Sequence, residues 1–193
     1  MVIRLYRHAP ALTPLNRVSD PAGRVGFQFN DGGRAAAGYR GKRSDCVVRA
    51  IAIAHFGADQ IQWVCASGRL TQSATAYNAA YDLLKAAAKK ERARTRKCRK
   101  SGERRVVAKS SISTGVWNPT TRRILTDLGW KWNPTMGIGG GCTTHLRADE
   151  LPSGRLIVAV SRHVCAVIDG IVHDTHCDDR DGTRCVYGFW SKP

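Results

Sequence analysis

SDCVVRAIAIA, residues 44–54, is the stretch that decides the fold. Asp45 is a residue type that caps helix N-termini by accepting a hydrogen bond from a first-turn amide, and Cys46 would then be the first helical residue. Both sides of this predicted helix are apolar, with one face formed by Val47, Ala50, Ile51 and Ala54 and the other by Val48, Ala52 and Ile53. A short helix that is apolar nearly all round belongs in a core. The sequence therefore predicts a buried helix that begins at a cysteine.

The predicted position of Cys46 bears on its chemistry. The first turn of a helix concentrates amide groups without helical partners and a partial positive charge. A thiol there has a lowered pKa, and the same amides can stabilise an oxyanion. A lone cysteine on an apolar helix is more often a small buried hydrophobe. Cys46 becomes a candidate nucleophile only if the fold brings a base to it.

Residues 156–176, LIVAVSRHVCAVIDGIVHDTH, are predicted to supply that base from a β-hairpin. One strand would run from Leu156 through Val167, and Asp169-Gly170 is a typical two-residue turn. Because side chains alternate between the faces of a strand, one face would carry His163, Cys165, Val167, Val172, Asp174 and His176. Asp174 is then a diagonal neighbour of His163 and can orient its imidazole.

A cysteine that opens an apolar helix, followed about 120 residues later by HVCAVIDGIVHD (163–174), resembles the papain-like cysteine peptidases. The resemblance is to the bacteriocin-leader-peptidase branch and to small phage and bacterial proteins of that superfamily. It implies an α+β fold in which a central helix carrying the cysteine packs on an antiparallel sheet. It also implies that Cys46 is the nucleophile, His163 the general base and Asp174 the orienting residue.

The chain departs from that family at one position. Such peptidases usually carry a glutamine about six residues before the cysteine, where its amide donates to the oxyanion, and this chain has Arg40 there. The nearest upstream amide side chains are Gln28 and Asn30. The sequence leaves open which group would fill this role.

The net charge of +16 is concentrated in residues 89–105, KKERARTRKCRKSGERR, which hold ten Lys or Arg and two Glu. We expect this segment to extend the alanine-rich helix before it and to loop out around Ser101-Gly102. It is either a solvated loop or a sequence-independent contact with nucleic acid or an acidic protein surface. The candidate nucleic-acid-binding residues are Arg92, Arg94, Arg96, Lys97, Arg99 and Lys100.

A metal centre is the competing chemical interpretation. Nitrogen and sulfur ligands are offered by Cys142-x-x-His145, by His173-x-x-x-Cys177 and by Cys185. Their spacing is not that of a standard zinc finger or ribbon, so we expect no metal and no cofactor. The seven cysteines are an odd number without a tight disulfide framework, and reduced thiols are expected throughout.

A chain of 193 residues is most simply one domain. We expect residues 1–27 to be a basic N-terminal extension and 28–193 to be the papain-like domain, with the basic helical or loop insertion at about 89–105. No stretch approaches about 18 consecutive apolar residues, so no membrane span is predicted. The first ten residues lack the apolar core of a signal peptide. A cytoplasmic protein is expected, in the host cytoplasm if the chain is phage-encoded.

The predicted function is a cysteine-dependent hydrolase of phage or bacterial origin, a peptidase or amidase acting on a protein or peptide substrate. An acyltransferase would use the same Cys–His–Asp chemistry. The alternative is a basic nucleic-acid-associated or host-modulating protein that acts by contact on a papain-like scaffold without catalysis.

Overall fold

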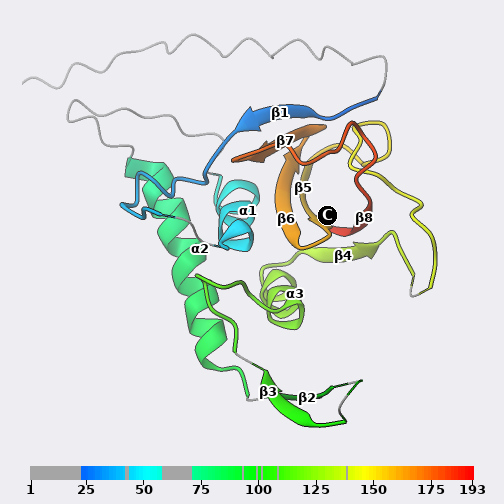
Figure 1. Ribbon diagram of the computed structural model, residues 1–193. Coiled ribbons are helices and arrows are strands. Elements are labelled where there is room, and N and C mark those ends of the chain that lie inside the picture. Colours follow the sequence, from blue (N-terminus) through cyan, green and yellow to red (C-terminus); the bar gives the residue numbers. More distant parts are fainter. Residues whose placement is uncertain are drawn as a thin grey trace, which may run out of the picture.

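The computed structural model describes residues 23–41, 44–57, 71–92, 94–98, 100, 102–107, 109–137 and 139–193. Within these ranges the helices and strands are, in chain order, β1 (Gly26–Phe29), α1 (Cys46–Ala54), α2 (Thr71–Lys89), β2 (Arg94–Lys97), β3 (Arg104–Val107), α3 (Asn118–Asp127), β4 (Lys131–Pro134), β5 (Arg155–Val160), β6 (His163–Ile168), β7 (Ile171–Asp174) and β8 (Val186–Ser191). The protein is therefore α+β, as predicted (Figure 1). None of the described helices is both long enough and apolar enough to span a bilayer.

Six strands form one sheet in the order β1-β7-β6-β5-β8-β4. β1 pairs in parallel with β7, whereas the other pairs in this sheet are antiparallel. The sheet is mixed, and not antiparallel as expected, because β1 joins the edge of the sheet beside β7 and runs parallel to it. β1 also begins before residue 28, the predicted start of the domain, and Val25 is already buried. Residues 1–22 of the predicted extension lie outside the described residues.

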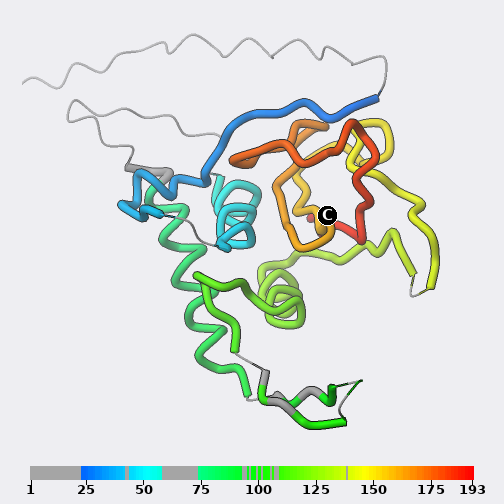
Figure 2. Tube along the Cα trace, in the orientation of Figure 1, coloured from blue at the N-terminus to red at the C-terminus, as the bar shows by residue number. Residues whose placement is uncertain are grey.

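The two faces of the sheet have separate cores. On one face α1 packs against β5 and β6, and α2 and α3 contribute Tyr77, Leu84 and Leu125 to the same cluster. The other face is covered by the segment that carries Leu146 and Leu151. All residues of α1 after Cys46 are buried, which confirms that this helix lies in the core. Figure 2 traces α1 (cyan) beside the much later β6 and β7 (orange).

The predicted single strand from Leu156 through Val167 is two strands, β5 and β6, which pair with each other. They are joined by Ser161-Arg162, and Arg162 has a left-handed φ of 60°. The predicted turn at Asp169-Gly170 is confirmed by the pairs Ile168–Ile171 and Ala166–His173. That ladder ends at Ala166–His173, so Asp174 and His176 lie beyond its last pair, whereas the predicted hairpin included both.

The basic segment was expected to extend the alanine-rich helix, but α2 ends at Lys89. Its described residues form the antiparallel hairpin β2–β3, which projects from the body in Figure 1. The helix ends because Glu91 turns inward, where its carboxylate accepts hydrogen bonds from the Ser110 amide and the Thr120 hydroxyl. Gly102, at a φ of 69°, closes the hairpin turn at the predicted place.

Candidate active site

Cys46 is the first residue of α1 and is partly buried, and the residue before it, Asp45, occupies the N-cap position as predicted. The Asp45 side chain makes no capping hydrogen bond, so that part of the prediction was wrong. Its carboxylate instead pairs with Arg34 Nε at 2.8 Å and Arg49 Nε at 3.3 Å and accepts a hydrogen bond from the Tyr77 hydroxyl at 2.7 Å. Charged donors bind a buried carboxylate more strongly than a backbone amide does.

The structure brings the three predicted catalytic residues together. His163 is the first residue of β6, and Asp174 is the last residue of β7. His163 Nε2 lies 2.5 Å from Asp174 Oδ2, and the His163 side chain also hydrogen-bonds to the Cys46 thiol. Because Nε2 faces the carboxylate, Nδ1 is the ring nitrogen left for the thiol. The three side chains form one series from carboxylate to imidazole to thiol.

The electrostatics of this series favour a thiolate beside an imidazolium. Burial alone would raise the pKa of Cys46, but the hydrogen bond and charge of His163, the Val164 amide and the charge of Arg49 together hold that pKa below its ordinary value of 9.0. Burial alone would lower the pKa of His163, but its bonds to Asp174 and Cys46 raise it to about 9. With a pKa of about 9, the His163 imidazole is protonated at neutral pH, and its charge favours the thiolate form of Cys46.

Asp174 stays ionised for a similar reason. Burial would raise its pKa, but the hydrogen bond to His163, the charge of Arg49 and the Thr175 amide hold the pKa below its ordinary value. The Thr175 N–H donates to Asp174 Oδ1 at 2.6 Å. A charged Asp174 both fixes the ring of His163 and stabilises its cationic form.

Arg49 was missed in the sequence, although it links the whole site. It lies one turn after Cys46 on α1 and is only 8% exposed. Its Nη1 donates to Asp174 Oδ1 at 2.7 Å and to Thr175 Oγ1 at 2.6 Å, while its Nε pairs with Asp45. A signal was present, because a charged residue within an apolar helix needs buried partners.

Among the groups considered for the oxyanion, the structure gives the Asn30 side chain another role. Asn30 accepts a hydrogen bond from the Gly32 amide at 2.8 Å through its side chain, and its own amide donates to the Asp174 carbonyl. Arg40 accepts a hydrogen bond from Arg34 through its carbonyl. Gln28 lies on β1 opposite His173. The first-turn amides of α1 are the donors that the helix itself supplies next to Cys46.

Cys165 does not compete as a nucleophile. It is 3% exposed and packs in the cluster with Val158 and Val167, on the sheet face away from α1. Burial, together with the charges of Asp174 and Cys46, raises the pKa of its thiol well above the ordinary value. Cys165 thus shares a sheet face with Val167 and Val172, as strand alternation predicted, but that face is buried at this position.

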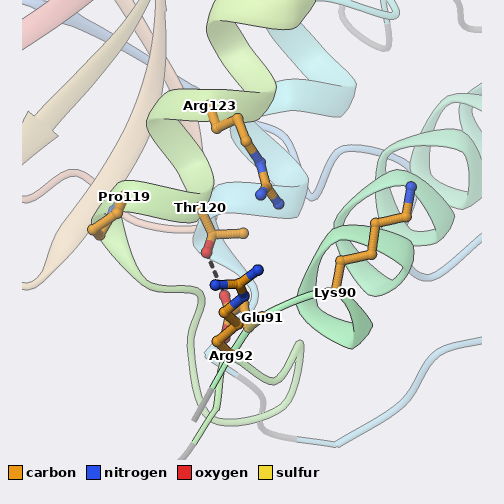
Figure 3. A pocket seen from close by; sticks show the side chains of 6 residues that line it. All are labelled: Lys90, Glu91, Arg92, Pro119, Thr120 and Arg123. Atoms are coloured by element: carbon orange, nitrogen blue, oxygen red, sulfur yellow. Dashed lines mark hydrogen bonds between the residues drawn. The ribbon is translucent and has the colours of Figure 1, made fainter. Parts of the chain in front are cut away.

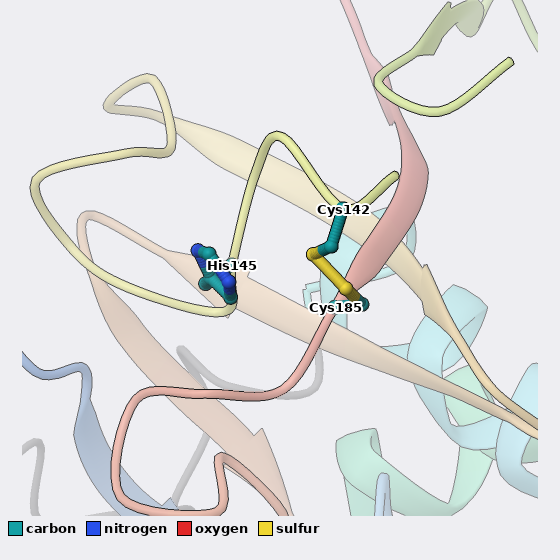
Figure 4. A group of neighbouring side chains, drawn as sticks. All are labelled: Cys142, His145 and Cys185. Carbon is teal, nitrogen blue, oxygen red and sulfur yellow. A yellow bond between two sulfur atoms is a disulfide. The ribbon is translucent and has the colours of Figure 1, made fainter. Parts of the chain in front are cut away.

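The candidate metal ligands divide into two sets. Cys142 and Cys185 are joined by a disulfide, which contradicts the expectation of reduced thiols throughout. His145 lies beside this pair (Figure 4). Among the described residues, His173 and Cys177 do not join that group.

Of the candidate nucleic-acid-binding residues, Arg92, Lys97 and Lys100 have exposed side chains, and Arg94 and Arg96 lie on β2. Arg99 lies outside the described residues. At the base of the hairpin is an open hollow of about 440 Å³, shown in Figure 3 and lined by Lys90, Glu91, Arg92, Pro119, Thr120 and Arg123.

Comparisons of the chain with protein-family models, with curated proteins and with solved structures find no match. The function is therefore argued from the residues and geometry of the site. Fold class alone would not fix it, because many chemistries share one scaffold.

Proposed function

We propose that this protein is a cysteine-dependent hydrolase with a papain-like fold, acting on an amide bond of a protein or peptide. The observation that carries the proposal is the hydrogen-bonded series from Asp174 through His163 to Cys46 at the start of a buried helix. The series contains an orienting carboxylate, a base and a nucleophile, which is the arrangement that covalent catalysis by a thiol requires.

In the first half of the proposed reaction the Cys46 thiolate attacks the substrate carbonyl carbon and forms a C–S bond. The developing oxyanion is stabilised by the first-turn amides of α1. The His163 imidazolium then donates its proton to the leaving nitrogen as the C–N bond breaks, which yields an amine and a thioester on Cys46.

In the second half, the oxygen of a water molecule attacks the thioester while neutral His163 accepts a proton from that water. The C–S bond breaks, the carboxylic acid leaves and the Cys46 thiolate is restored beside imidazolium. Asp174 holds the ring in one orientation through both halves. If an amine rather than water accepted the acyl group, the same residues would catalyse acyl transfer.

The test is acylation by p-nitrophenyl acetate, followed by mass spectrometry of the intact and digested protein. We expect one acetyl group on Cys46 and its loss with time by hydrolysis, because this ester needs no specific binding pocket. His163→Ala should slow both steps. If the acetyl group resides on Cys98 or Cys177 instead, or if His163→Ala acylates as fast as the wild type, the proposed function is wrong.

A second candidate function, nucleic-acid binding, is favoured by the hairpin and the hollow at its base. Three cationic side chains, those of Lys90, Arg92 and Arg123, line that hollow. α3 begins beside it, and a helix N-terminus favours anions. The basic hairpin β2–β3 continues from the same place. A phosphate backbone could follow this surface without base-specific contacts.

Neutralising the hairpin should therefore weaken nucleic-acid binding and flatten its salt dependence. The variant changes Arg92, Arg94, Arg96, Lys97, Arg99 and Lys100 to glutamine. Each lost phosphate contact should reduce the slope of log affinity against log salt by about 0.9 on duplex DNA and about 0.7 on single strands. Fluorescence anisotropy with duplex DNA, single-stranded DNA and RNA measures this.

The matched control neutralises Arg40 and Lys131, which are exposed outside the hairpin and the hollow. It should change affinity far less than the hairpin variant. Equal affinity of the wild type and the hairpin variant at every salt concentration would show that the segment is only a solvated arm.

A further inference from the structure

Cys142, His145 and Cys185 form a cluster that the proposed reaction does not use. The two sulfur atoms and one ring nitrogen of His145 all lie within 4.8 Å of one another. Cys142 and His145 come from the segment between β4 and β5, and Cys185 directly precedes β8 (Figure 4). Residues from two separate segments thus converge with the donor atoms that zinc prefers.

Backbone hydrogen bonds hold the two segments together independently of the sulfur atoms. His145 and Cys185 form an isolated antiparallel bridge. The Leu146 amide donates to the Arg184 carbonyl at 2.8 Å, and the Val186 amide donates to the Thr144 carbonyl at 2.9 Å. Breaking the disulfide would therefore leave the three side chains positioned by this short ladder.

His145 is also oriented in the way a metal ligand requires. Its Nδ1 lies 3.1 Å from Glu150 Oε2, and the same oxygen accepts the His145 backbone N–H at 2.6 Å. Arg147 Nε lies 3.2 Å from Glu150 Oε1 and steadies the carboxylate. A carboxylate that binds one ring nitrogen fixes the tautomer and leaves the other nitrogen, here Nε2, as the ligand atom.

We propose that Cys142, His145 and Cys185 bind one zinc ion when the Cys142–Cys185 disulfide is reduced. A thiol or phosphine reductant supplies two electrons, two protons convert the sulfurs to thiols, and zinc binding then releases those protons. Two thiolates and one neutral imidazole balance the charge of Zn²⁺, and water fills the fourth position of the tetrahedron. The disulfide-bonded form and the zinc-bound form of this cluster exclude each other, since both use the same two sulfur atoms.

The proposed function is compatible with the reduced state of this cluster, because the Cys46 thiolate must itself be reduced for the enzyme to act. Only this support for the reduced state of Cys142 and Cys185 rests on the proposed function. Zinc content can be measured without any activity, so failure of either proposal is distinguishable from failure of the other.

The experiment measures zinc in the full chain by mass spectrometry after reduction with a phosphine, incubation with ZnCl₂ and desalting. We expect one zinc per chain in the wild type and none in the oxidised protein. Cys142→Ser, Cys185→Ser and His145→Ala should each lose it. Cys177→Ser is the matched control, because Cys177 is a free, exposed cysteine outside the cluster. It should keep the zinc.

His145→Ala separates a metal site from a mere disulfide, since the disulfide does not need the imidazole. Glu150→Gln should weaken zinc binding about 10- to 100-fold in a chelator competition while the fold is kept. Two results would overturn the proposal. The first is that the reduced wild type binds no zinc, or that His145→Ala binds zinc as tightly as the wild type does. The other is zinc that Cys46→Ala abolishes, which would place the ion at Cys46 and His163.

Discussion

Cys46→Ala and His163→Ala will each lower turnover of an amide or ester substrate by about six orders of magnitude. Cys46 forms the covalent bond and His163 moves the proton at every step, so neither loss can be compensated by the other groups of the site. Asp174→Asn will lower turnover less, by about four orders of magnitude, because it affects the orientation and charge of the imidazole rather than the bonds that form. Single-turnover kinetics on purified variants measure these effects.

The control for this series is Cys165→Ala, which removes the buried thiol and leaves the proposed nucleophile. It should retain most of the turnover once the folded fraction is matched. A loss of activity in Cys165→Ala but not in Cys46→Ser would mean that the nucleophile is assigned to the wrong cysteine. Full activity in both variants would remove the thiol mechanism altogether.

Arg49→Met should lower the free energy of unfolding by about 3–5 kcal/mol, because it leaves two buried carboxylates without their shared cation. Asp45 and Asp174 are each only 3% exposed, so water cannot replace the guanidinium. The pKa of Cys46 should also rise, because the charge of Arg49 helps to lower it. Chemical denaturation followed by circular dichroism measures the first effect and thiol alkylation the second.

Arg123→Met is the matched control for Arg49→Met, since Arg123 is an exposed arginine of α3. It should change stability by no more than about 0.5 kcal/mol. Arg49→Lys keeps the charge, but its side chain cannot reach Asp45, Asp174 and Thr175 together. Its free energy of unfolding should therefore lie between those of Arg49→Met and Arg123→Met. Equal stability of Arg49→Met and the wild type would mean that the ion-pair network does not hold the site together.

The features that the sequence predicted correctly are encoded locally. The apolar pattern after Cys46 specifies α1, and Asp169-Gly170 specifies the turn between β6 and β7. These two elements bring residues 46, 163 and 174 into one place even though the details of the pairing differ. The hairpin was predicted to continue past its actual end, but Asp174 still reaches His163 from the last position of β7.

The features that were missed depend on partners far away in the chain. Asp45 has the chemistry of a helix cap, and only the arrival of Arg34 and Tyr77 turns its carboxylate to another role. Ser161-Arg162 contains no glycine, proline or asparagine, so the break between β5 and β6 lacks the strongest turn signals. Likewise, Glu91 ends α2 because of Ser110 and Thr120, which follow it in the sequence by 19 and 29 residues.

The most direct test of the central claim, a Cys46 thiolate paired with a His163 imidazolium, is the rate of iodoacetamide alkylation from pH 5 to 10, resolved by cysteine with mass spectrometry. Cys177 is an internal comparator, because it is more exposed but burial and the nearby Asp179 and Asp178 carboxylates raise its pKa. We predict that Cys46 reacts faster than Cys177 at pH 7, with an inflection below the ordinary value of 9.0.

A second change should occur near pH 9, where His163 loses its proton and the ion pair with it. His163→Ala should remove that change and move the inflection of Cys46 upward. The opposite result, in which Cys46 reacts more slowly than Cys177 at neutral pH and its profile is the same in His163→Ala, would contradict the claim.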